Sequence, residues 1–426
     1  MSIQKSTTCP HCWVAFPPYE IRWIAHHPEL DDDVKVAAGQ RRFLPTMYDV
    51  QGNAIDPRGE TCTALACPSC HLEIPRDLVE LPTTFFSILG SPSSGKSYYL
   101  TAALYRLRTT LSRHFHVSFE DSDPTANEKV HEYEDTLFLN SDHSKPVALP
   151  KTELDGDLYA SVEIEPGRVV TLPQPFSFRM RLLPDHPNYV RIPRNGRAFC
   201  LYDNAGEHFL PNASTANSPG TKHLGVSKSL LFVFDPTQHH TVRRVLSGKA
   251  DDPQISSQAR STRQDQILTE AARRVRADRG LAPDERDTRP LIVVLTKYDA
   301  WSVLVGEREL KRKWALGRGR DGLVRLNVRQ IRNLSDQFRA VMQKYCPEVV
   351  AAADAFSEDV IFIPCSALGC SPVQQSDGTL AVNPKNVSPI WAEVPLLYAI
   401  HRSIPGFIAD AGKQKSKPSA TEGARR

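Results

Sequence analysis

A glycine-rich segment at residues 90–97 constrains the fold of this chain more than any other feature, because it fits the pattern G-x-x-x-x-G-K-[ST]. A short apolar run precedes it at residues 84–89, and residues 98–111 carry leucines at helical spacing. A turn of this kind between a strand and a helix directs backbone N–H groups, together with the helix N-terminus, toward an anion. The pattern therefore predicts a strand, a phosphate-binding loop and a helix in succession.

This loop and the residue that follows it form the first candidate site. Its candidate phosphate-binding residues are Gly90, Ser91, Pro92, Ser93, Ser94, Gly95, Lys96, Ser97 and Tyr98. In this pattern the lysine, here Lys96, reaches the β- and γ-phosphates, and the hydroxyl of Ser97 ligates Mg²⁺. The loop alone indicates a nucleoside triphosphate and does not identify the base.

Short apolar runs alternate with helical stretches along the rest of the chain. The expected strands are residues 176–183, 197–203, 230–235, 291–296 and 360–364, and the expected helices are 262–278, 327–345 and 393–403. Continuous apolar strands bounded by helices predict an α/β domain with a doubly wound, mostly parallel sheet. We place this domain at residues 83–409, with insertions at about 113–175 and 237–261, and we expect the polar tail 410–426 to be disordered.

A T-K-Y-D segment at residues 296–299 suggests which base is bound. It directly follows an apolar run and is a variant of the guanine-reading pattern N-K-x-D. A carboxylate, here Asp299, accepts two N–H donors, which guanine presents side by side and adenine lacks. The stem of Lys297 would lie along the base. Thr296 replaces the usual asparagine, so we expect looser ties to the phosphate-binding loop.

Two further short motifs lie in the order that a guanine-nucleotide site requires. Asp203 and Gly206 frame a D-x-x-G segment after an expected strand, where the aspartate would hold Mg²⁺ and the glycine N–H would contact the γ-phosphate. An S-A-L segment, made of Ser366, Ala367 and Leu368, follows the last expected strand and would direct backbone N–H groups toward guanine O6. Each motif is weak alone, and their order along the chain strengthens them.

Together these four motifs resemble the GTPase domains of the translation-factor-like (TRAFAC) class, over roughly residues 83–405. The D-N-A-G-E form of the second motif and the cysteine-rich N-terminus look like a bacterial double-GTPase family. The resemblance implies a Mg²⁺-dependent switch that binds GTP and GDP and hydrolyses GTP. The family implies service with protein partners in a multi-component system of conflict or defence. Many members of the class dimerise across the nucleotide, so a homodimer stays open.

The resemblance also implies catalytic residues that the motifs do not fix. A threonine of the class closes over Mg²⁺ and the γ-phosphate. Thr152 and Thr171 are the candidates here, and we favour Thr152 because the residues around Thr171 resemble a strand. Glu207 follows Gly206 where the best-known members have a glutamine that orients the attacking water. Glu207 or His208 is the candidate for that role, and we expect slow hydrolysis without a partner because a carboxylate there repels the γ-phosphate.

The N-terminal residues 1–82 predict a separate metal-binding module. Two C-P-x-C knuckles supply Cys9, Cys12, Cys67 and Cys70, which fit a tetrahedral Cys₄ zinc site. The long segment between the knuckles implies an inserted subdomain, so the module is zinc-ribbon-like. Cys62 is an alternative ligand, and His11 or His71 a weaker one. Four thiolates leave no open position on the metal, so we expect zinc to stabilise the fold and not to catalyse.

Composition bounds the alternatives. The net charge is only +3, and an Asp31–Asp33 run lies in the N-terminal module, so nucleic acid is not indicated as a partner. No apolar run approaches a membrane span and no signal segment opens the chain, so we expect a cytoplasmic protein. A zinc-dependent adaptor for protein or nucleic acid, with a structural nucleotide site, is the competing hypothesis. A P-loop ATPase would require T-K-Y-D and S-A-L to be coincidences.

Overall fold

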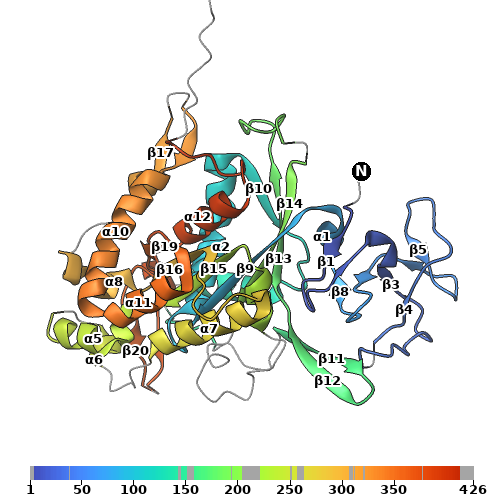
Figure 1. The fold of residues 1–426 in the computed structure, drawn as a ribbon, viewed down its shortest axis with the longest axis horizontal. Coiled ribbons are helices and arrows are strands. Elements are labelled where there is room, and N and C mark those ends of the chain that lie inside the picture. Colours follow the sequence, from blue (N-terminus) through green and yellow to red (C-terminus); the bar gives the residue numbers. More distant parts are fainter. Residues whose placement is uncertain are drawn as a thin grey trace, which may run out of the picture.

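A mixed seven-stranded sheet forms the centre of the molecule in the computed structural model (Figure 1). The structure describes residues 4–412, apart from 38, 143–144, 151–157, 193, 204–220, 250–251, 257–262, 307–309, 311, 320–321 and 377. In spatial order the strands are β10 (Val117–Asp121), β13 (Phe176–Leu182), β14 (Gly196–Asp203), β9 (Thr83–Gly90), β15 (Ser229–Phe234), β16 (Asp287–Leu295) and β19 (Ser357–Pro364). The strands from β14 to β19 are parallel, whereas β13 runs antiparallel to both of its neighbours. The expected α/β class is therefore confirmed, with a mixed sheet.

Helices cover both faces of this sheet. The longer ones are α2 (Lys96–Thr110), α7 (Gln264–Arg279), α10 (Val328–Tyr345), α11 (Pro347–Phe356) and α12 (Val394–Ser403). The shorter ones are α3 (Glu128–Glu134), α4 (His223–Val226), α5 (His240–Leu246), α6 (Pro253–Ser256), α8 (Tyr298–Trp301) and α9 (Arg312–Ala315). Helices α2 and α12 pack together on one face, and α7 and α11 pack together on the other (Figure 1). Burial on both faces explains why β15 consists entirely of buried residues.

Part of the segment expected to be an insertion at 113–175 belongs to the main sheet. Strand β10 forms its edge, and it was missed because only Val117 and Phe119 alternate as buried residues between polar neighbours. The same segment holds a hairpin, β11 (Tyr159–Glu165) and β12 (Arg168–Pro173), outside the main sheet. The other expected insertion, 237–261, contains α5 and α6.

The N-terminal module consists of short strands joined by turns. They are β1 (Thr7–Thr8), β2 (Ala15–Phe16), β3 (Arg22–Ile24), β4 (Arg42–Phe43), β5 (Ala54–Ile55), β6 (Thr61–Cys62), β7 (Leu65–Ala66) and β8 (Glu73–Ile74), followed by α1 (Arg76–Glu80). The module lies beside the sheet near β14, and the β11–β12 hairpin extends along it (Figure 1). Glu163 of the hairpin donates its N–H to the Lys35 carbonyl of the module at 2.9 Å.

Strand β14 joins two cores, because its side chains alternate between the faces of the sheet. Phe199 and Leu201 lie in the main core with α2. Ala198, Cys200 and Tyr202 lie instead in a second core, which they share with the buried cysteines of the N-terminal module. The module therefore completes its core against the sheet and not from its own residues alone.

None of the helices that the structure describes combines the length and the apolar character that crossing a membrane would need.

Phe199→Ala tests the antiparallel side of the sheet. The Phe199 ring is fully buried and lies 4.9 Å from the Phe86 ring and 5.9 Å from the Phe119 ring, centroid to centroid. We expect the substitution to lower the free energy of unfolding by about 3–5 kcal/mol, measured by urea denaturation. Val169→Ala on the exposed surface of β12 is the control, with an expected change within about 0.5 kcal/mol. Equal effects of the two substitutions would contradict this packing.

Candidate functional site

A cavity of about 470 Å³ lies where β9, β16 and β19 reach their carboxyl ends. Twelve of the residues suggested by the sequence line it: Pro92, Ser93, Gly95, Lys96, Ser97, Tyr98, Thr296, Lys297, Asp299, Ser366, Ala367 and Leu368. Three segments that are far apart in the sequence thus meet at one edge of the sheet. In open α/β sheets this edge is where ligands bind.

Glycine is required by the backbone at both ends of the loop. A Cβ atom on Gly90 would lie 2.4 Å from the Val233 carbonyl oxygen of β15, so a side chain there would clash. Gly95 has a φ of +86° immediately before α2, in the left-handed region that favours glycine. Ser93 also has a positive φ, of +58°. The loop therefore makes the tight turn that its glycine spacing predicted.

The side chains of Lys96 and two glutamines hold the first half of the loop. The Lys96 ammonium is buried and donates to the carbonyl of Ser91 at 2.9 Å and to that of Gly90 at 3.2 Å. Gln238 donates to the Pro92 carbonyl at 3.3 Å. The Ser91 hydroxyl lies 3.2 Å from the side-chain oxygen of Gln264, an oxygen that also accepts the N–H of Asp235, directly after β15. Sequence reasoning missed both glutamines, because neither belongs to a motif.

Thr296 keeps a direct tie to the loop, contrary to the expectation of looser ties. Its hydroxyl lies 2.9 Å from the Ser94 carbonyl and 3.1 Å from the Phe234 carbonyl, so one side chain spans the loop and β15. Trp301 donates its indole N–H to the Thr296 carbonyl at 2.8 Å and fixes the turn that follows. A threonine hydroxyl thus reaches the loop where the pattern usually has an asparagine amide.

Lys297 bridges the loop and a buried acid. Its ammonium lies 2.6 Å from Asp235, which is fully buried at the end of β15, and donates to Gln254 at 2.5 Å and to the Ser93 carbonyl at 3.3 Å. Its φ of +55° turns the chain toward the cavity. The Lys297 stem also lies against Gly95, where an added Cβ would be 3.8 Å from Cε. Gln254 lines the cavity from the segment that was expected to be an insertion.

The Asp299 carboxylate is the strongest sign that the cavity takes a ligand. Burial raises its pKa, while the neighbouring Ser366 hydroxyl acts in the opposite direction. One carboxylate oxygen, Oδ1, is buried and has no hydrogen-bond partner among the described residues. Leaving such an atom without a donor costs free energy that a ligand with N–H groups would recover.

The S-A-L segment is fixed beside Asp299 by backbone pairing. Ser366 and Ile390 exchange two backbone hydrogen bonds of 2.9 Å, and the buried Ser366 hydroxyl accepts the Gly369 N–H at 2.7 Å. Because the Ser366 N–H is already bonded, the Ala367 N–H is the better candidate donor to a ligand. A Cβ on Gly369 would lie 2.0 Å from the Ser388 carbonyl oxygen, so the turn requires glycine there.

The apolar wall of the cavity comes from segments that sequence reasoning did not assign to the site. It is formed by Ala148, Leu149, Pro150, Cys370, Pro372, Leu380, Ala381 and Val382. Tyr98 accepts the Leu149 N–H at 2.9 Å, and Val147 pairs with Val382 next to the short hairpin of β20 (Val373–Gln374) and β21 (Leu380–Ala381). The pairing of Val147 with Val382 joins parts of the chain more than 200 residues apart, which no local pattern signals.

The remaining candidates lie at different places. Asp203 is buried at the end of β14, where it pairs in register with Ile88 of β9, and it is not among the described residues that line the cavity. Thr171 is in β12, on the hairpin beside the N-terminal module, as its strand-like surroundings suggested. Four other candidates lie outside the described residues: Thr152, Gly206, Glu207 and His208.

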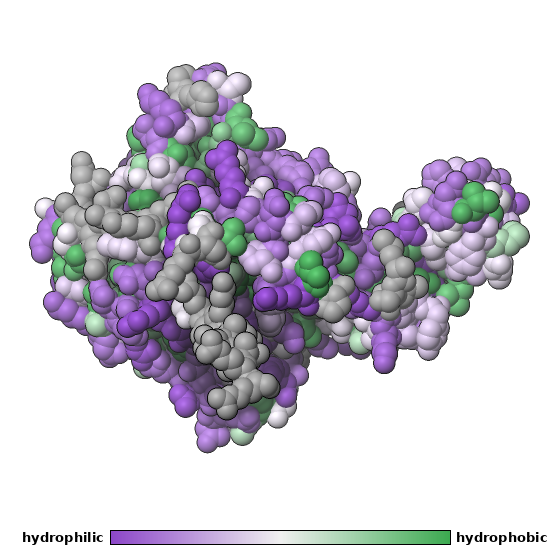
Figure 2. All heavy atoms as spheres, turned by 90° about the horizontal axis from the view of Figure 1, so that it is seen from above, coloured by the Kyte–Doolittle hydropathy of each residue, from purple (hydrophilic) through white to green (hydrophobic). Residues whose placement is uncertain are grey.

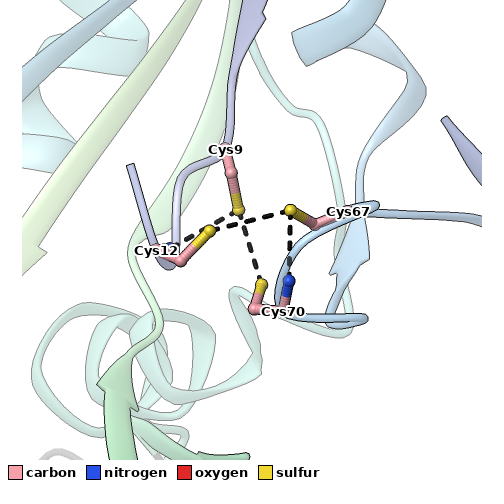
Figure 3. Close-up of side chains that lie close together, drawn as sticks. All are labelled: Cys9, Cys12, Cys67 and Cys70. Carbon is pink, nitrogen blue, oxygen red and sulfur yellow. Dashed lines mark hydrogen bonds between the residues drawn. The ribbon is translucent and has the colours of Figure 1, made fainter. Parts of the chain in front are cut away.

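The four predicted cysteines form one cluster in the N-terminal module (Figure 3). All four Sγ atoms lie within 4.8 Å of one another, with Cys9 and Cys70 at 3.7 Å and Cys12 and Cys67 also at 3.7 Å. A zinc ion with bonds of about 2.3 Å to four sulfurs places them about 3.8 Å apart. The cluster could therefore hold a metal ion such as zinc.

Backbone and side-chain contacts shape this cluster. The His11 N–H donates to the Cys9 sulfur and the Ser69 N–H to the Cys67 sulfur, each at 3.3 Å, as the two knuckles predict. The alternative ligands have other partners. The Cys62 sulfur lies 3.9 Å from Asp56, the His11 ring contacts the carbonyl of Glu73 at 2.9 Å, and His71 pairs with Asp33 at 2.8 Å.

The thiols of the cluster cannot all ionise equally without a cation. Burial raises the pKa of Cys9, and the hydrogen bond with Cys12 raises the pKa of Cys70. Hydrogen bonding from Cys67 lowers the pKa of Cys12. A divalent cation would stabilise all four thiolates at once, so metal binding would be coupled to folding of the module.

Comparison with known proteins gives no identity for the chain. No protein-family model matches it, and no curated protein matches it either. The inference about its function therefore rests on the geometry of the cavity and of the cysteine cluster.

Cys67→Ser tests the metal cluster, with Cys62→Ser as the matched control because Cys62 lies outside it. We expect the purified protein to carry one zinc ion per chain by elemental mass spectrometry. Cys67→Ser should lose it because one of the four ligands is gone, while Cys62→Ser keeps it. Zinc retained in Cys67→Ser, or lost in Cys62→Ser, would show that the ligands have been assigned incorrectly.

Proposed function

We propose that this protein binds guanine nucleotides in the cavity at the edge of the sheet and hydrolyses GTP with Mg²⁺, as a switch of the TRAFAC type. The observation that carries the proposal is the convergence of the loop 90–97, the T-K-Y-D segment and the S-A-L segment on one cavity. The three segments follow three different strands, β9, β16 and β19. Coincidental matches would have no reason to line the same space.

The phosphate end of the proposed site is the turn before α2. Glycine at residue 95 and the helix N-terminus favour an anion, and Lys96 lies buried beneath the same turn. On nucleotide binding, Lys96 would exchange its carbonyl contacts for the β- and γ-phosphates, and Ser97 and Asp203 would hold Mg²⁺. Magnesium would supply charge neutralisation for the γ-phosphate as its bond breaks.

The base end of the proposed site is built for guanine. The Asp299 carboxylate, whose buried Oδ1 has no partner among the described residues, would accept the N1–H and N2 amine donors, and the Ala367 N–H would donate to O6. The stem of Lys297 would cover the base on the side of the loop. An adenine base would leave the Asp299 carboxylate desolvated and unpaired, which disfavours ATP.

Turnover is proposed to be slow without a partner, because Glu207 stands in the motif where related enzymes have a water-orienting glutamine.

The N-terminal module has a second proposed role as a docking site for a protein partner. Its surface exposes several apolar side chains (Figure 2), with Val34 at 76% and Val50 at 97% relative exposure. Exposed apolar residues of this kind mark interaction surfaces when they are grouped.

Asp299→Asn, assayed by equilibrium binding of GTP and xanthosine triphosphate, tests the guanine assignment. The asparagine amide can donate to the additional oxygen of xanthine but no longer accepts both guanine donors. We expect the affinity for GTP to fall about 10- to 150-fold, and the preference to shift toward xanthosine triphosphate.

Asp252→Asn is the matched control for this experiment. Asp252 is a buried acid near Asp299 that raises the pKa of Asp299 by charge repulsion, yet it does not line the cavity. The Asp252→Asn substitution should leave the preference for GTP over xanthosine triphosphate unchanged. If wild-type protein binds ATP as well as GTP, or if both variants behave alike, Asp299 does not select the base.

A further inference from the structure

The first cysteine knuckle is bonded directly to the end of strand β14. Tyr202 donates its hydroxyl hydrogen to the Pro10 carbonyl, within the knuckle. The indole N–H of Trp13 donates to the same Tyr202 oxygen at 3.0 Å. Trp13 holds a φ of +59°, unusual for a bulky residue, directly after the ligand Cys12. The hydroxyl of Tyr202 is therefore bonded from two sides by one knuckle.

A buried histidine extends this contact to the phosphate-binding strand. The His223 ring stacks on Tyr202 with centroids 4.5 Å apart and an interplanar angle of 20°, and lies 6.1 Å from Trp13. Its Nδ1 lies 2.6 Å from the hydroxyl of Ser87, in β9. His223 is fully buried and Tyr202 is 1% exposed, so solvent does not interrupt these contacts.

This network of hydrogen bonds and ring contacts lies next to Asp203, a residue of the proposed Mg²⁺ site. Tyr202 pairs in register with Ser87, and the next residue, Asp203, pairs with Ile88 two positions before Gly90. The peptide between Tyr202 and Asp203 thus links a side chain held by the knuckle to the carboxylate proposed to hold Mg²⁺. Ala198 and Cys200, on the same face of β14, contact the module through apolar packing instead.

We infer that Tyr202 is a positioning residue through which the metal-bound knuckle sets the placement of the Asp203 carboxylate, so that metal at the cysteine cluster and Mg²⁺ with GTP at the cavity bind cooperatively. This inference rests on the proposed function, since it concerns the same Mg²⁺ site. Coupling of this kind is reciprocal: each ligand raises the affinity for the other by the same factor. A module that only stabilised the fold would show no such reciprocity at concentrations where the protein stays folded.

The test compares wild type with Tyr202→Phe, which keeps the ring and removes the hydroxyl. A fluorescent, non-hydrolysable GTP analogue is titrated at a series of free Mg²⁺ concentrations and in Mg²⁺-free buffer without a chelator, so that the cysteine cluster keeps its metal. We expect the variant to need about 5- to 20-fold more Mg²⁺ for half-maximal binding, while its affinity without Mg²⁺ stays at the wild-type value. Tyr99→Phe is the control, because the buried Tyr99 hydroxyl has no partner among the described residues, and it should change neither value.

The reciprocal measurement follows the metal at the cysteine cluster. Competition with a colorimetric chelator of known affinity gives the dissociation constant for zinc with and without Mg²⁺ and the GTP analogue. We expect the nucleotide to raise the affinity of wild type for zinc by the same 5- to 20-fold factor, and to have little effect on the affinity of Tyr202→Phe for zinc. Trp13→Phe, which removes one of the two hydrogen bonds, should give an intermediate result and replaces Tyr202→Phe if that variant fails to fold.

The outcomes separate the two proposals. Wild-type protein that binds the GTP analogue, with the same Mg²⁺ dependence and the same zinc affinity in all variants, overturns the inference and leaves the proposed function standing. Wild-type protein that binds no GTP analogue overturns both. A Tyr202→Phe variant that loses affinity equally without Mg²⁺ and with it also overturns the inference, because the residue would then act on the pocket as a whole.

Discussion

The conformation of the loop at residues 90–94 depends on side chains that engage each of its carbonyl groups. Lys96 bonds the first two carbonyls, Gln238 the third, Lys297 the fourth and Thr296 the fifth. A peptide whose carbonyl groups are all bonded to the protein can direct N–H groups elsewhere, which is the arrangement that an anion site needs. Since three of these side chains come from segments after β15, the conformation of the loop depends on contacts that are distant in the sequence.

Features that depend on neighbouring residues in the sequence were predicted, whereas those that depend on contacts between distant segments were not. The strands β9, β15, β16 and β19 were anticipated within a few residues because each contains a mostly apolar run. The cavity-lining residues of the motifs were anticipated because their spacing in the sequence is fixed by one turn each. Gln254, Leu149 and Val382 were not, because they reach the cavity through tertiary pairing and have no pattern of their own.

The N-terminal module shows the same division. The C-P-x-C spacing identified the four clustered cysteines, since each knuckle is a local turn. The sequence indicated that the apolar core of the module is too thin to be stable alone. It did not indicate that Ala198, Cys200 and Tyr202 of β14 complete that core. The module is thus a part of the same folded unit as the candidate site. A change at the cysteines has a short physical route to β14.

The central claim is that the cavity is selective for guanine, and calorimetric titration of the wild-type protein with GDP and with ADP, each in Mg²⁺, tests it most directly. Because the Asp299 carboxylate would be left unpaired by adenine, the account predicts one GDP bound per chain and an affinity for ADP at least about 100-fold lower. Equal affinities for the two nucleotides, tighter binding of ADP, or no binding of GDP would contradict it.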